Sequence, residues 1–184
     1  MTVTAADLDA VATQLGRTPR GVLDISYRCP DGAPGVVKTA PKLDDGTPFP
    51  TLYYLTDPRL TSEASRLEVA HVMKWMTARL ETDAELRADY QRAHEYFLAK
   101  RNAIEDLGTD FSGGGMPDRV KCLHVLIAYA LAEGPQHFRL GTEAVAMAAD
   151  HAGLRGTAEP RQIEQSQPQQ APQAQTDTQH NTSA

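Results

Sequence analysis

The sequence predicts an α+β domain in which a small antiparallel sheet of about three strands packs against four to five helices. Two features predict this fold, and a third sets the C-terminal limit of the domain. Three short apolar segments before residue 58, one with strict alternation, are typical of strands. After residue 58, apolar residues recur every three or four positions, as in amphipathic helices. Residues 157–184 are rich in Gln and Pro and carry Ile163 as their one large apolar side chain.

The composition limits the class of protein. The chain has 184 residues, 41% hydrophobic and 23% charged, which suits one globular domain with its own core. Its net charge of −6 gives no overall attraction to nucleic acid or to an anionic membrane, so neither is an expected partner. There is no apolar run long enough to span a membrane, and the acidic start, with Asp7 and Asp9, is unlike a signal peptide. We therefore expect a cytoplasmic protein.

The change in composition predicts a domain boundary. Residues 1–156 should form a single domain, and residues 157–184 should be a disordered tail. A segment this polar cannot bury enough apolar surface to offset the conformational entropy that it would lose on ordering.

The first expected element is a short amphipathic helix near the N-terminus. Thr4 suits its capping position, and Gly16 suits the left-handed residue that ends it. Its apolar side would be formed by Leu8, Val11, Ala12 and Leu15.

Three strands should follow. Leu23, Ile25 and Tyr27 alternate with polar residues, which predicts a half-buried strand. The segment "GVVKT" would pair with it across the turn "PDGAPG", and "TLYYLT" would be the third strand. The loop "APKLDDGTPFPT" lies between the last two strands, and its prolines prevent regular pairing.

Helices are expected in the rest of the domain. The first apolar stripe contains Val69, Val72, Met73, Met76 and Leu80. The second contains Leu86, Tyr90, Ala93, Phe97, Ile104 and Leu107. The turn "ETDA" should join them as two antiparallel helices. A third long helix is expected from Pro117 to Gly134, and a last one from Thr142 to about Ala149.

The stretch "GGGMPDRVKCLH", residues 113–124, is the first candidate site. It lacks the Lys-Ser or Lys-Thr ending of a P-loop. Flexible glycines before a helix start can expose N–H groups to an anion, and Arg119 and Lys121 lie close by in sequence. The alternative is a helix start whose basic residues merely face solvent.

Cys122, His124 and Cys29 are candidate metal ligands, because thiolate and imidazole suit zinc. On an intact helix, residues two apart diverge by about 200°. Cys122 and His124 could therefore share a metal only if the helix were irregular there. The alternatives are a small buried hydrophobe for each cysteine and a hydrogen-bonded core residue for His124. A nucleophilic Cys122 would need a base from another element.

Four blocks together resemble the bacterial DUF501 family of uncharacterised proteins: "GRTPRGVLDISYRCPDGAPGVVKTAP", "DGTPFPTLYYLTDP", "SRLE" and "GGGMPDRVKCLH". The resemblance runs from about Leu15 to Ala148 and implies one cytoplasmic domain without an established activity. Members are often encoded near a septum-formation-initiator-like protein and an exopolyphosphatase, which implies a cell-envelope or polyphosphate context. Where this chain has Asp57, the family has Cys or His. Because all three residue types bind metals, the resemblance adds Asp57 to the candidate ligands.

The leading functional hypothesis is a ligand-binding or regulatory module. Its metal site would be formed by four potential zinc ligands: Cys29, Asp57, Cys122 and His124. Three basic residues would bind a small anion such as phosphate or polyphosphate: Arg28, Arg119 and Lys121. A metal-assisted hydrolase or phosphate-ester enzyme using the same pocket is the alternative. A third hypothesis is a protein-interaction domain, with a protein partner and inert, buried thiols.

Overall fold

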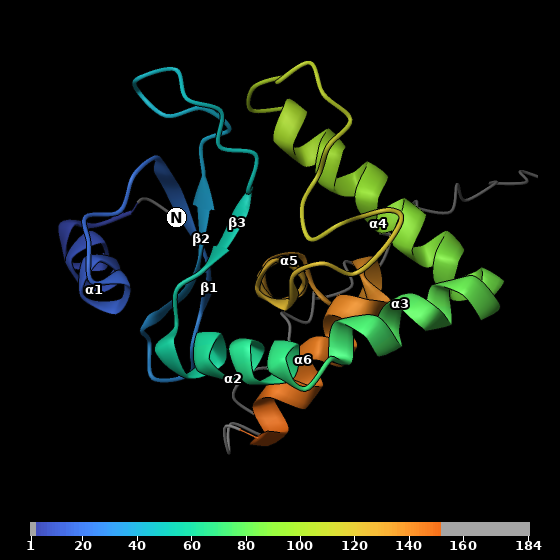
Figure 1. Cartoon of the computed structure of the whole chain (residues 1–184). Coiled ribbons are helices and arrows are strands. Elements are labelled where there is room, and N and C mark those ends of the chain that lie inside the picture. The colour runs from blue at the N-terminus through green and yellow to red at the C-terminus, as the bar shows by residue number, and fades with distance from the viewer. Residues whose placement is uncertain (1–2, 152–184) are drawn as a thin grey trace, which may run out of the picture.

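The computed structural model describes residues 3–151, which form a three-stranded antiparallel sheet and six α-helices (Figure 1). Helix α1 (Ala5–Leu15) lies on one side of the sheet and helix α5 (Leu123–Glu133) on the other. The predicted α+β fold is confirmed. The boundary predicted at residue 156 and the tail predicted for residues 157–184 lie outside the described residues.

Helix α1 begins and ends where the sequence predicts. The Thr4 hydroxyl accepts a hydrogen bond from the backbone N–H of Asp7 at 3.2 Å, and Asp7 Oδ2 accepts one from the backbone N–H of Thr4 at 3.1 Å. This reciprocal pair is a capping box. Gly16 ends the helix with φ of +66°, a conformation that costs glycine little. Val11 is fully buried, whereas Leu8 is 39% exposed, so the apolar side is narrower than predicted.

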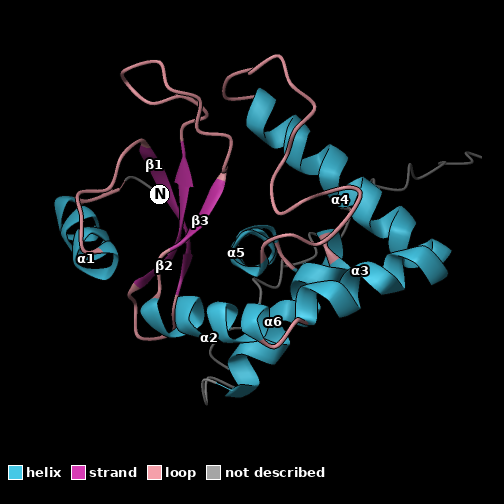
Figure 2. Ribbon diagram, in the orientation of Figure 1, coloured by secondary structure: helices cyan, strands magenta, loops and turns pink. Residues whose placement is uncertain are grey.

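The sheet contains β1 (Val22–Arg28), β2 (Pro34–Thr39) and β3 (Tyr53–Leu55), which pair in that order (Figure 2). All three predicted strands are therefore present. The tight turn between β1 and β2 is closed by two backbone hydrogen bonds, from Cys29 N to Ala33 O at 2.9 Å and from Gly32 N to Cys29 O at 2.8 Å. This turn fixes the position of Cys29 at the end of the sheet.

The apolar side chains of β1 do not share one face. Leu23 is 46% exposed, Ile25 packs with Val11 beneath α1, and Tyr27 packs into the main core. The pairing with β2 shifts register between Ile25 and Tyr27. Such an irregularity bends the strand and changes the side to which the next residue points, so simple alternation fails there.

The helices that follow are α2 (Pro58–Val69), α3 (Val72–Thr82) and α4 (Ala84–Asn102). The break between α2 and α3 was not predicted. His71 adopts a left-handed φ of 62°, and Val69 is 79% exposed rather than part of an apolar stripe.

Helices α3 and α4 meet at Asp83, within the predicted turn, and form a V in Figure 1. The Asp83 carboxylate accepts a hydrogen bond from Leu86 N at 2.9 Å and so caps α4. The helix ends at Asn102, and the predicted stripe residues Ile104 and Leu107 lie beyond it.

Helix α5 is the centre of the core. Every residue from Leu126 to Leu131 is fully buried, because the helix is enclosed by β3, α2 and α6 (Arg139–His151). A helix that is apolar all round is expected to be central. The short 3₁₀ helix η1 (Pro135–His137) connects α5 to α6, which contains the predicted helix from Thr142 to Ala149.

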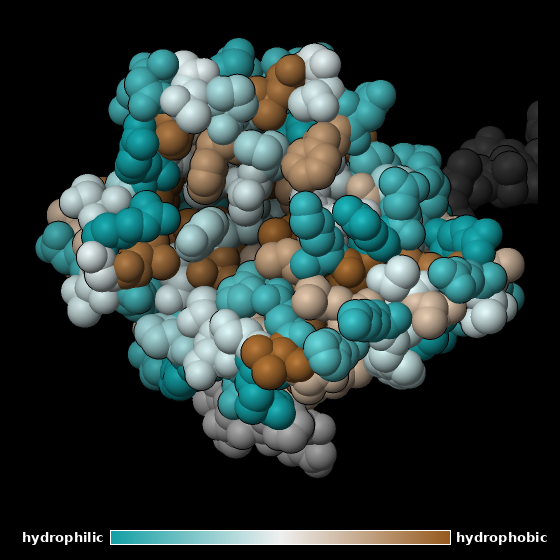
Figure 3. All heavy atoms as spheres, in the orientation of Figure 1, coloured by the Kyte–Doolittle hydropathy of each residue, from teal (hydrophilic) through white to brown (hydrophobic). Residues whose placement is uncertain are grey.

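The surface shown in Figure 3 is mostly hydrophilic, with hydrophobic residues in small separate groups. Among residues 3–151, no helix combines the length and the apolar character needed to cross a bilayer.

Candidate metal centre

The glycine run that leads to the candidate site forms a closed turn. Gly114 O accepts a hydrogen bond from Lys121 N at 2.6 Å, and Gly115 O accepts one from Arg119 N at 3.1 Å. Gly115 has φ of +91°, and a Cβ there would lie 2.5 Å from Arg119 O. Only glycine fits this close approach of two backbone segments.

Tertiary hydrogen bonds hold the next residues outside any helix. Val120 N donates to Thr77 Oγ1 on α3 at 3.0 Å, and the Tyr90 hydroxyl on α4 donates to Arg119 O at 3.1 Å. Because these groups bond to neighbouring helices, α5 begins at Leu123 and not at the predicted Pro117.

This later start changes the relation between Cys122 and His124. Cys122 precedes α5 in an extended conformation, with φ of −150° and ψ of 117°. The divergence of about 200° expected on an intact helix therefore does not apply, and the structure brings Cys122 and His124 together with Glu68 at the end of α2. One potential ligand atom from each of these three residues lies within 4.8 Å of the other two.

Glu68 is positioned by the first turn of α5. Its Oε1 accepts a hydrogen bond from Leu123 N at 2.7 Å and lies 3.1 Å from His124 Nδ1. An N–H at a helix start is unpaired within the helix and carries partial positive charge, so it favours a carboxylate.

Ser65 orients the other side of the His124 ring. Ser65 Oγ donates to Thr61 O at 3.0 Å and lies 3.4 Å from His124 Nε2. Because the hydroxyl proton is already used, Oγ is available to accept from Nε2–H. Nδ1 then faces Glu68. A metal-binding histidine commonly donates its second N–H in this way.

The cluster also holds a positive charge. The hydrogen bond with Cys122 outweighs the opposing effect of burial and, with Glu68, raises the pKa of His124 to about 9. At neutral pH the imidazolium of His124 therefore pairs with the Glu68 carboxylate.

Cys122 and His124 form part of the wall of a hollow of about 430 Å³. The rest of the wall comes from β3, the residues around it and the ends of α1 and α5: Leu15, Thr51, Tyr53, Tyr54, Leu55, Thr61 and Val125. The volume lies in the range of small-molecule sites, and the lining combines apolar side chains with a few hydroxyls.

Cys29 and Asp57 form a different, buried cluster. Cys29 Sγ donates to Asp57 Oδ2 at 3.2 Å, and the exposed fractions of the two residues are 6% and 1%. The Asp57 carboxylate also caps α2, accepting from Arg59 N at 2.9 Å and Leu60 N at 3.1 Å. Its strongest partner is Arg59, whose Nη2 donates to Oδ2 at 2.6 Å.

These contacts set the protonation states in that cluster. Burial, together with the hydrogen bond to Asp57, raises the pKa of the Cys29 thiol to about 12. Burial also opposes ionisation of Asp57, but the hydrogen bonds from Arg59 and Cys29 lower the pKa of Asp57 overall. Cys29 is therefore a neutral thiol bonded to an ionised cap.

The four predicted metal ligands thus fall into two pairs. Among residues 3–151, only Glu68, Cys122 and His124 form a group of three potential ligands within 4.8 Å, and no such group joins Cys29 or Asp57 to Cys122.

The predicted anion-binding residues also separate. Arg28 pairs with Asp7 on α1 at 2.8 Å and donates to Gly32 O at 3.2 Å. Arg119 and Lys121 are exposed and line a shallow hollow beside α3 together with Lys74.

Glu68 is not among the ligands that the sequence predicts. It lies at the end of an amphipathic helix, where acidic residues are usually solvated. The one signal was its place in "SRLE", a block that carries the family resemblance.

Comparison with known proteins agrees with that resemblance. The family described as "Protein of unknown function (DUF501)" matches residues 25–146. No curated protein and no solved structure is significantly similar to the chain.

Proposed function

The chain belongs to the DUF501 family of proteins of unknown function, and from its geometry we propose that it binds zinc through Glu68, Cys122 and His124. The ion would present an open coordination position to a small ligand in the adjacent hollow. The observation that carries the proposal is the convergence of these three ligand types from two separate elements. Cys29 and Asp57 are left out of the site, because their polar atoms already bond to each other and to α2.

The spacing of the three ligand atoms suits zinc after a small adjustment. Zinc bonds of about 2.0 to 2.3 Å in a tetrahedron place ligand atoms about 3.3 to 3.8 Å apart. The three ligand atoms are already within 4.8 Å of one another, so the site would require them to move closer by up to about 1.5 Å, through rotation of the half-buried Glu68 and Cys122 side chains.

The charges also balance. Zinc carries two positive charges, and the Glu68 carboxylate with a Cys122 thiolate supplies two negative ones. The ion would replace the proton on His124 and the proton on the Cys122 thiol, so binding releases protons. The cytoplasm that the sequence predicts would keep Cys122 reduced.

Three protein ligands leave the fourth position of a tetrahedral zinc for a water or a ligand. The hollow of about 430 Å³ that Cys122 and His124 border gives space for that ligand. We therefore infer a regulatory or ligand-binding role in which zinc coordinates an oxygen of a small anion, with phosphate as the first probe.

Cobalt(II) substitution tests the ligand set. A Co²⁺–thiolate bond gives a near-ultraviolet charge-transfer band, so metal-free full-length protein should develop this band at one equivalent of Co²⁺. Cys122→Ser should abolish the band, and Glu68→Gln should weaken Co²⁺ binding by about tenfold or more. Cys29→Ser is the matched control and should behave as wild type. A band that survives in Cys122→Ser but is lost in Cys29→Ser contradicts the proposal.

A metal-assisted hydrolase is the second candidate, favoured by the three-ligand set with an open position, which is the form of catalytic zinc sites. The zinc-loaded protein would then hydrolyse an activated ester or phosphate ester, and Cys122→Ser would remove the activity. Zinc binding without turnover of either substrate would leave the ligand-binding role.

A further inference from the structure

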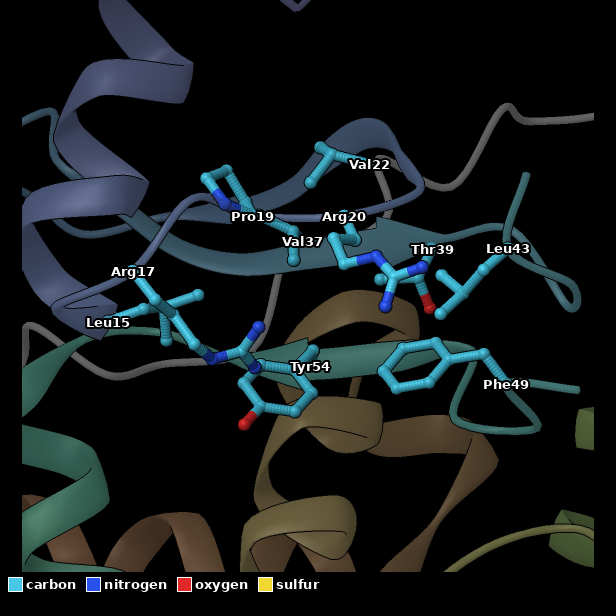
Figure 4. A pocket seen from close by; sticks show the side chains of 10 residues that line it. All are labelled: Leu15, Arg17, Pro19, Arg20, Val22, Val37, Thr39, Leu43, Phe49 and Tyr54. Carbon is cyan, nitrogen blue, oxygen red and sulfur yellow. The ribbon is translucent and has the colours of Figure 1, made fainter. Parts of the chain in front are cut away.

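A second hollow lies on the face of the sheet that α1 partly covers, beside the C-terminal end of α1 (Figure 4). Here α1 covers only part of the sheet, through the packing of Val11 on Ile25 and Val37. The uncovered part is bordered by the segment after α1 and by the loop before β3. It adjoins the hollow beside the proposed metal centre but contains none of the three proposed zinc ligands.

The interior of this hollow is apolar. Val22, Val37 and Tyr54 come from three adjacent strands, and Phe49 reaches over them from the loop. The Phe49 and Tyr54 rings lie 6.4 Å apart at an interplanar angle of 30°. The space measures about 140 Å³, and an apolar protein cavity of about 150 Å³ holds one benzene ring. The hollow therefore has the size of a single ring.

Two arginines give this apolar hollow a positive rim. In Figure 4, the Arg17 side chain runs toward the Tyr54 ring, and the Arg20 guanidinium lies between Thr39 and Phe49. No carboxylate lines the hollow. Arg17 makes no ion pair or hydrogen bond with any residue in the described range 3–151.

Arg20 pairs with Asp45 at 2.7 Å, and the exposed fractions of the two side chains are 56% and 52%. An ion pair this exposed contributes little and exchanges readily. Both guanidinium groups can therefore turn to an incoming anion.

The walls are held in place before any ligand arrives. Gly21, next to Arg20, has φ of +62°, and a Cβ there would lie 3.3 Å from Leu43 Cδ2, so a larger residue would crowd the hollow. The loop is closed by hydrogen bonds from Leu43 N to Thr47 O at 3.0 Å and from Phe49 N to Pro41 O at 2.6 Å. Preformed walls reduce the entropy cost of binding.

We propose that this hollow binds a small monocyclic carboxylic acid in its ionised form. The ring lies between Val22, Val37 and the aromatic side chains, and the carboxylate accepts hydrogen bonds from Arg17 and Arg20. A planar guanidinium matches a carboxylate with two parallel N–H donors, which is why arginine suits this head group. The combination of a ring-sized apolar space with two arginines distinguishes this ligand from a neutral ring or from inorganic phosphate.

Titration of ¹⁵N-labelled full-length protein with sodium benzoate tests the proposal by NMR. Benzoate should shift the backbone amide signals of Val22, Val37 and Tyr54. Benzamide, with the ring but no charge, and acetate, with the charge but no ring, should each bind at least about tenfold more weakly. Equal binding of benzamide and benzoate would overturn the proposal, as would the absence of shifts at about 10 mM benzoate.

Two variants assign the two parts of the site. Arg17→Gln combined with Arg20→Gln should weaken benzoate binding by about a hundredfold, whereas the control Arg92→Gln, at an exposed residue of α4, should have no effect. Val22→Phe should fill the ring space and abolish binding while both arginines remain. Benzoate binding that is unchanged in both variants would contradict the proposal.

Zinc could also bind a carboxylate, and the two hollows share Leu15 and Tyr54 as wall residues. The titration is therefore repeated on Cys122→Ser with a chelator present. Unchanged binding supports the arginine site, and its loss would assign benzoate to the metal centre and overturn this proposal. Unchanged binding is the expected result whether or not the proposed zinc site exists.

Discussion

The two cysteines lie in clusters built from similar parts, a thiol, a carboxylate and a cation, but the two clusters differ in what they leave available. At Cys29, Asp57 is 1% exposed, and its carboxylate accepts hydrogen bonds from the thiol, from Arg59 and from the start of α2. At Cys122, the thiol is half-buried, the cation is the titratable His124, and an open hollow lies alongside.

The surroundings, and not the residue types, therefore decide whether such a cluster stabilises the fold or binds a ligand. An arginine cannot give up its proton, so the charges around Asp57 are permanent. A histidine can give up its proton, and a metal can take the place of that proton.

The largest expected difference is in thiol reactivity. With a pKa of about 12, raised from an ordinary value of 9.0, Cys29 has about a thousandfold less thiolate than an ordinary cysteine at neutral pH. In the metal-free native protein, an aromatic disulfide reagent should therefore modify Cys122 quickly and Cys29 only on unfolding. Cys122→Ser should remove the fast phase, and Cys29→Ser should preserve it. A fast phase that persists in Cys122→Ser would remove the distinction between the two sites.

The next effect is on stability. Asp57→Ala removes two capping bonds, the Arg59 ion pair and the partner of the buried Cys29 thiol. We expect a loss of about 2 to 4 kcal/mol in the free energy of unfolding, measured by urea denaturation of metal-free protein.

Asp83→Ala is the matched control, because Asp83 caps α4 through one bond to Leu86 N. It should cost only about 1 kcal/mol. Equal losses for the two variants would show that the Cys29 cluster adds nothing beyond a helix cap.

The Cys122 cluster should make the stability of the folded protein depend on pH. Folding raises the pKa of His124 from its ordinary value of 6.5 to about 9, so its charged form stabilises the folded state below pH 6.5. That stability is lost as the pH rises from 6.5 to about 9.

We expect a loss on the order of 1 kcal/mol for metal-free protein over this interval, because a third of the His124 side chain is exposed and solvent screens the pair. His124→Gln should flatten the curve between pH 6.5 and 9. If His124→Gln has the same dependence of stability on pH as wild type, a group other than His124 causes that dependence.

The smallest expected effect concerns the neighbours of Cys122. Arg119 and Lys121 are exposed and line one hollow, so millimolar phosphate should raise the melting temperature of metal-free protein by about 1 to 2 °C. Combined Arg119→Ala and Lys121→Ala should abolish the shift, whereas Arg28→Ala, at an arginine paired with Asp7, should leave it in place. An unchanged shift in the double variant would remove these two residues from anion binding.

The sequence predicted the fold where local chemistry determines structure. Thr4 and Gly16 mark the ends of α1 because capping preferences are local. All three strands were found. The break at His71 was missed, because a left-handed histidine has no strong sequence signal. The sequence also did not predict that Ile25 and Tyr27 pack on different sides of the sheet, since this depends on the register of β1 with β2.

The candidate site was predicted only in part, for the same reason. Cys122 and His124 were singled out by residue type, but the expected helix start at Pro117 separated them. Thr77 accepts a hydrogen bond from Val120 N and Tyr90 donates one to Arg119 O, and these contacts, distant in sequence, keep that segment out of the helix. Glu68 reaches the site only because α2 ends against the start of α5. Such long-range contacts are invisible to local patterns.

Elemental analysis of purified, untagged protein measures directly whether the three residues bind zinc. We expect one zinc per chain in wild-type protein and in Cys29→Ser, and less than about a tenth of that in folded Cys122→Ser, since loss of the thiolate removes one of three ligands. Wild-type protein that stays metal-free after incubation with equimolar zinc would contradict the proposed zinc site, as would zinc that depends on Cys29 and not on Cys122.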